Sequence, residues 1–131
     1  MEVGDVNLAA GWAGIVLGAV SGSALGLFFA RADWLGGYAS WPRRMLRLAH
    51  VSLVGLGLLN IALALTVRVA GLEAGSRAAG ALLLVGLVTM PATCALSAWR
   101  PAFRHAFPLP VLAVMIAAGL VVMGLLQGGA P

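Results

Sequence analysis

The chain has 131 residues, of which 62% are hydrophobic and only 9% are charged. A typical soluble domain carries about 25% charged residues, so this chain lacks the polar groups that a water-exposed surface needs. Its mean hydropathy of +1.04 is typical of integral membrane proteins. The net charge of +4 does not indicate nucleic-acid binding, because the arginines fall in short breaks between apolar runs rather than on one amphipathic face.

Four apolar runs predict an all-α integral membrane protein with a single membrane domain over residues 1–131. We expect helices over about residues 8–30, 42–67, 78–98 and 109–126, each near the ~20 residues that cross a hydrocarbon core of about 30 Å. Backbone groups in lipid must be hydrogen-bonded within their own segment, which favours helices. Because the three connections are short, the helices should alternate in direction, as in an up-down bundle of four transmembrane helices.

The arginines predict the orientation of these helices. Six of the eight basic residues fall in the first and third connections, and basic residues collect on the cytoplasmic side of a membrane. The absence of Lys beside abundant Ala, Gly and Val indicates a bacterial source, so we expect a multi-pass protein of the bacterial inner membrane with both termini outside the cytoplasm. No basic residue precedes Arg31, so the first run is expected to be a retained helix rather than a signal peptide.

Gly14, Gly18, Gly22 and Gly26 recur at a spacing of four and lie on one stripe of the first predicted helix. In water each would destabilise that helix by about 0.5–1 kcal/mol relative to Ala, but in lipid small residues allow two helices to pack closely. Such a glycine zipper resembles the packing helix of ATP-synthase ring subunits, although their mid-membrane carboxylate has no counterpart here. The stripe predicts packing against another helix of this chain or against another subunit, including a homo-oligomer through the first helix.

Two histidines are the main candidates for binding a cofactor. His50 lies in the second predicted helix with Gly57 two turns deeper on the same face, and His105 lies just before the fourth. Neutral imidazole suits haem iron or copper, and a glycine leaves space for the edge of a planar ring. Haem b held by His50 and His105 is therefore an alternative to the simpler expectation that both histidines are structural and no cofactor is bound. The lone Cys94 allows no intrachain disulfide, and no metal site is predicted.

Three arginines open the second predicted helix. Ser40 is its expected N-cap, and Pro42 fits the first turn. Arg43, Arg44 and Arg47 then stand at the positive end of the helix dipole, where positive charge is unfavourable. We expect these arginines to fix the topology and to contact anionic lipid headgroups, or else to form a docking patch for an acidic partner or a cofactor propionate.

The polar residues indicate no catalytic role. The sequence has no carboxylate pair, activated nucleophile or phosphate loop, and its acidic residues fall outside the predicted helices: Glu2, Asp5, Asp33 and Glu73. We therefore expect a small structural or accessory subunit, not an enzyme. Its partners would be membrane lipids and the other subunits of a larger complex, such as one of respiratory or photosynthetic electron transfer, and not nucleic acid. A haem- or copper-binding electron carrier and a small channel or transporter are the alternatives.

Overall fold

The computed structural model of the chain describes residues 3–72 and 75–128, which form helices joined by short turns. Four of the helices are long and apolar enough to cross a membrane, which confirms the all-helical architecture with four such segments. The elements in chain order are α1 (Val3–Leu27), the 3-10 helix η1 (Trp34–Gly36), α2 (Trp41–Ala70), α3 (Ser76–Trp99), the 3-10 helix η2 (Pro101–Ala106) and α4 (Pro108–Gly128).

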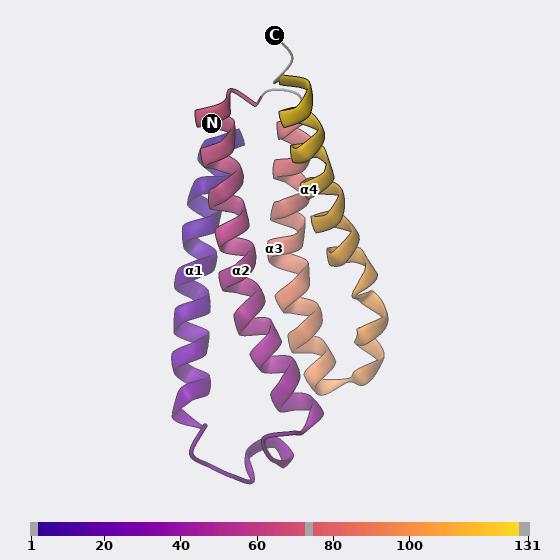
Figure 1. Cartoon of the computed structure of the whole chain (residues 1–131). Coiled ribbons are helices and arrows are strands. Elements are labelled where there is room, and N and C mark those ends of the chain that lie inside the picture. Colours follow the sequence, from indigo (N-terminus) through magenta and orange to yellow (C-terminus); the bar gives the residue numbers. More distant parts are fainter. Residues whose placement is uncertain (1–2, 73–74, 129–131) are drawn as a thin grey trace.

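The four long helices stand side by side and alternate in direction (Figure 1). α1 packs mainly on α2, α2 on α3, and α3 on α4, while α1 also touches α3. The helices therefore form an open row with α1 and α4 at its two ends, in the up-down order that the short connections predicted. An open row leaves broad apolar faces on both sides of the central helices.

The first helix begins about five residues earlier than the apolar run indicated. Asp5 lies in its first turn, where a carboxylate complements the positive end of the helix dipole. It also forms an ion pair with Arg68, which lies in the last turn of α2. Asp5 is thus inside a helix and not outside it as expected, whereas Glu2 and Glu73 lie outside the described residues.

The second helix begins as the sequence predicted. The Ser40 side chain accepts a hydrogen bond from the backbone N–H of Arg43 at 3.4 Å, and Pro42 occupies the first turn. These contacts confirm the predicted N-cap. At the same end of the row, the indole Nε1 of Trp41 donates to the carbonyl of Ser97 at 2.8 Å and ties the start of α2 to the end of α3.

The interior of the row is built from small and branched apolar side chains. A buried cluster of Leu63, Ala79, Leu83 and Ala117 joins α2, α3 and α4. Large apolar side chains on every long helix point outward instead, among them Val20, Leu58, Val88 and Met115. Apolar residues on both the inside and the outside are what a helix surrounded by lipid requires.

Candidate functional site

The glycine stripe of α1 lies against α2 of the same chain. A Cβ atom placed on Gly11 would lie 2.6 Å from the carbonyl oxygen of Gly57, and one placed on Gly57 would lie 2.7 Å from the carbonyl oxygen of Gly11. A Cβ atom at Gly14 would lie 3.1 Å from the carbonyl oxygen of Leu53, and one at Gly18 would lie 3.3 Å from the backbone nitrogen of Val54. Side chains are nearer still at both positions, Leu87 of α3 at Gly14 and Val54 itself at Gly18. Real side chains do not approach this closely, so the two backbones are in direct contact and the stripe is filled from within the chain.

Gly26 differs from the other three glycines of the predicted stripe. A Cβ atom at Gly26 would meet nothing within 4 Å, because α1 ends one residue later at Leu27 and α2 has diverged from it at this end (Figure 1). Equal spacing in the sequence therefore does not mean equal packing. A groove for another subunit's helix would have to use a surface other than Gly14, Gly18 and Gly22.

His50 closes the α1–α2 contact near its loop end. A Cβ atom at Gly22 would lie within 2.9 Å of three ring atoms of His50, and the His50 Nδ1 lies 2.7 Å from the carbonyl oxygen of Gly18. Because a carbonyl oxygen only accepts, Nδ1 carries the hydrogen. Gly22 thus makes room for an imidazole that hydrogen-bonds across to α1.

The haem arrangement predicted from the two histidines does not fit this geometry. The space beside Gly57 is filled by the Gly11 carbonyl and by Ile15 of α1, so no ring edge can enter there. His105 lies exposed in η2, which packs on α3 and α4, whereas His50 faces α1. Among the described residues no group of three or more His, Cys, Asp or Glu side chains could hold a metal ion.

The three arginines at the start of α2 separate into two groups. Arg43 is buried, with 3% of its surface exposed, and its guanidinium donates to the carbonyl of Phe29 at 3.1 Å. The guanidinium carbon also lies 5.5–5.8 Å from the ring centres of Phe29, Trp34 and Tyr38. Arg43 therefore holds the α1–α2 connection in place through cation–π contacts and is not a free docking residue.

Arg44 and Arg47 remain accessible. Arg44 is exposed and Arg47 is half-buried, with its guanidinium carbon 4.3 Å from the centre of the Tyr38 ring. Together with Leu48 and Val51 they line an open surface depression of about 230 Å³ along α2. Within the described residues the ion pair between Arg68 and Asp5 is the single one, so neither Arg44 nor Arg47 has a carboxylate partner there.

A buried polar cluster lies toward the end of the row where α1 and α3 begin, and its member Asn7 was missed by the sequence reasoning. The Asn7 amide nitrogen donates to the Asn60 side-chain oxygen at 2.6 Å and to the carbonyl of Gly80 at 3.1 Å. The Asn60 amide nitrogen donates to the carbonyls of Leu56 and Leu83. Both asparagines are at most 1% exposed, so they join α1, α2 and α3 at one buried point, with the Asn7 Oδ1 left without a hydrogen bond.

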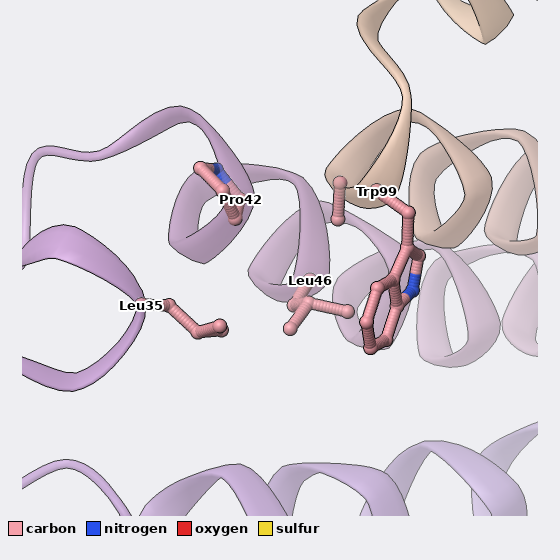
Figure 2. A pocket seen from close by; sticks show the side chains of 5 residues that line it. Leu35, Pro42, Leu46 and Trp99 are labelled. Atoms are coloured by element: carbon pink, nitrogen blue, oxygen red, sulfur yellow. The ribbon is translucent and has the colours of Figure 1, made fainter.

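An apolar pocket of about 150 Å³ lies at the loop end of the row. Figure 2 shows Leu35 and Trp99 on its opposite sides, with Leu46 between them and Pro42 above. Leu35 has a positive φ of 52°, a conformation that is uncommon for residues other than glycine. The pocket offers surface for apolar contact and presents no group that can perform acid-base or redox chemistry.

No protein-family model, no curated protein and no solved structure matches this chain.

Proposed function

We propose that this protein is a non-catalytic accessory subunit of a larger complex in the bacterial inner membrane, with both termini outside the cytoplasm. The observation that carries the proposal is an apolar groove of about 240 Å³ that runs between α2 and α4 with α3 at its floor. Its lining includes Leu83 on α3, Ala62 and Thr66 on α2, and Ala117 and Ala118 on α4.

The composition of this groove favours a transmembrane helix as its occupant. Small residues let helix backbones approach closely in lipid, where packing and not the exclusion of water drives association. Ala62, Ala117 and Ala118 supply small residues on both walls. The open row also leaves α4 without a neighbour on the side away from α3, so a partner helix would complete the packing that a closed bundle provides internally.

The engagement of the polar side chains supports a structural role. Asn60 binds α1 and α3, His50 binds α1, and Arg43 binds the α1–α2 connection. Each of these polar groups therefore holds helices together. A complex of respiratory or photosynthetic electron transfer is the assembly that we propose, and the cofactors would belong to the partner subunits.

The proposal is tested by the native size of the protein in its own membrane. The tagged chain is extracted from its host in mild detergent and separated on a native gel, and the band is analysed by mass spectrometry. We expect a large band with defined companions that disappear with Ala118→Trp, which fills the groove, and persist with Ala9→Trp on the exposed face of α1. Migration of the wild-type chain alone, or equal behaviour of the two variants, would contradict the proposal.

A further inference from the structure

We propose that Arg44 and Arg47 form a binding site for the phosphate of an anionic phospholipid, with one acyl chain lying along Leu48 and Val51. This inference needs the proposed membrane insertion but not a partner subunit, so it can fail or succeed independently of the accessory role.

The site follows from one stripe of α2. The residues that line the open depression of about 230 Å³ are Arg44, Arg47, Leu48 and Val51. Their spacing of i, i+3, i+4 and i+7 places them on one face of the helix. The arginines occupy the loop end of this stripe and the apolar residues continue toward the middle of the helix. A charged end followed by an apolar end reproduces the order of headgroup and acyl chain in a phospholipid.

The two guanidinium groups are available for an anion. No carboxylate of the described residues pairs with either arginine, and the neighbouring Arg43 is itself a cation, which donates to the carbonyl of Phe29. Two unpaired arginines beside the positive end of a helix dipole create a local field that attracts phosphate. Arginine binds phosphate through paired N–H groups, which makes it well suited to this contact.

Tyr38 positions one of the two arginines. The guanidinium of Arg47 stacks over the Tyr38 ring with 4.3 Å between the guanidinium carbon and the ring centre. Such stacking restricts the side chain without using its N–H donors. Tyr38 is therefore a positioning residue of the site, and phosphate contact falls to Arg44 and Arg47.

The apolar part of the stripe selects a lipid over a free anion. Leu48 and Val51 are 48% and 58% exposed, and they would have no function for inorganic phosphate. An acyl chain covers them with a surface of matching polarity. The occupant is thus a phospholipid with net negative charge, such as phosphatidylglycerol, and not a soluble phosphate compound.

The test compares lipid binding by purified full-length variants in mixed micelles, using native mass spectrometry with phosphatidylglycerol and with phosphatidylcholine. We expect the wild type to retain phosphatidylglycerol preferentially. The double variant Arg44→Gln/Arg47→Gln should bind it about thirtyfold more weakly, because each basic residue near an anionic lipid contributes about fivefold. The matched control Arg100→Gln/Arg104→Gln removes two exposed arginines from the other connection at the same end of the row and should bind normally.

A second variant separates the lipid from a free anion. Val51→Trp keeps both arginines but blocks the apolar part of the site, so it should weaken phosphatidylglycerol binding severalfold while leaving any binding of inorganic phosphate unchanged. Equal loss in the two double variants would show diffuse attraction to positive charge and would overturn the proposal. Displacement of the lipid by inorganic phosphate, with Val51→Trp behaving as wild type, would identify a free-anion site and would overturn it as well.

Discussion

The two outer helices of the row are attached in different ways. α1 meets α2 backbone to backbone at Gly11 and Gly57, and it is also held by hydrogen bonds from His50 and to Asn60. α4 meets α3 through apolar side chains, as where Val114 fills the space beside Gly86. A backbone contact fixes the distance between two helices, whereas a side-chain contact can be repacked. The first interface should therefore tolerate substitution far less well than the second.

The largest effect is expected at the backbone contact. Gly57→Leu would drive a side chain into the Gly11 carbonyl and force α1 away from α2, which should destabilise the protein by about 1–3 kcal/mol or more. Reversible unfolding in a detergent titration measures this loss. Gly55→Leu is the matched control, because a Cβ atom at Gly55 would meet nothing within 4 Å, and it should be at least as stable as the wild type. Similar losses for the two variants would contradict the assigned interface.

A smaller loss is expected from the buried amide pair. Asn60→Leu removes hydrogen bonds to α1 and α3 and leaves the Asn7 amide short of a partner, and each such bond in a membrane contributes about 0.6 kcal/mol and at most about 1.7 kcal/mol. We expect a loss of about 1 kcal/mol in the same titration. The double variant Asn7→Leu/Asn60→Leu should recover part of this loss, because replacing both partners leaves no polar group unpaired. Strictly additive losses would show that the two asparagines act separately.

At the interface between α3 and α4, a second substitution should be able to offset the destabilisation that a first one causes. Gly86→Ala places a Cβ atom 2.7 Å from a methyl group of Val114, but alanine also favours the helix by about 1 kcal/mol, so the net loss should stay below about 1 kcal/mol. The same substitution in a Val114→Ala background should become neutral or stabilising, a coupling that a double-mutant cycle measures. Absence of coupling would place Gly86 against something other than α4.

The smallest effect is expected for hydroxyl groups that bond only to their own helix. The Thr89 hydroxyl donates to the carbonyl of Val85 at 2.6 Å, and Thr89 is half-buried. That carbonyl already has its helical partner, so Thr89→Val should change stability by less than about 0.5 kcal/mol. A larger loss would reveal a contact between Thr89 and another helix.

The four helices and their breaks could be predicted from the sequence, because each helix contains an uncharged apolar run of about 20 residues and the charged residues lie between the runs. The start of α1 could not, because Asp5 and Asn7 are polar and their partners Arg68 and Asn60 are more than 50 residues away along the chain. Judged from local composition alone, such polar residues mark the end of an apolar run and therefore the end of the predicted helix. Only the packing of α1 on α2 shows that they belong inside it.

The candidate site could be predicted only in part, because its geometry also depends on contacts between residues far apart along the chain. Periodicity shows which residues share a stripe but not which helix covers it, so Gly26 looked equivalent to Gly18 although it lies beyond the α1–α2 contact. In the same way Arg43 looked equivalent to Arg44, although one is buried against aromatic rings and the other is exposed. The open row and its groove depend on long-range packing that no local pattern encodes.

Cysteine cross-linking tests whether the glycine stripe of α1 is filled by α2 of the same chain. A Cβ atom at Gly18 would lie 3.5 Å from the Leu53 Cβ, which is within the range of a disulfide. In a Cys94→Ala background, Gly18→Cys/Leu53→Cys should oxidise to a disulfide within one chain and run as a monomer on a non-reducing gel. Gly26→Cys/Leu53→Cys should form no such bond. A disulfide-linked dimer through Gly18 would instead show that the stripe receives a second copy, and it would contradict packing of the stripe on α2 of the same chain.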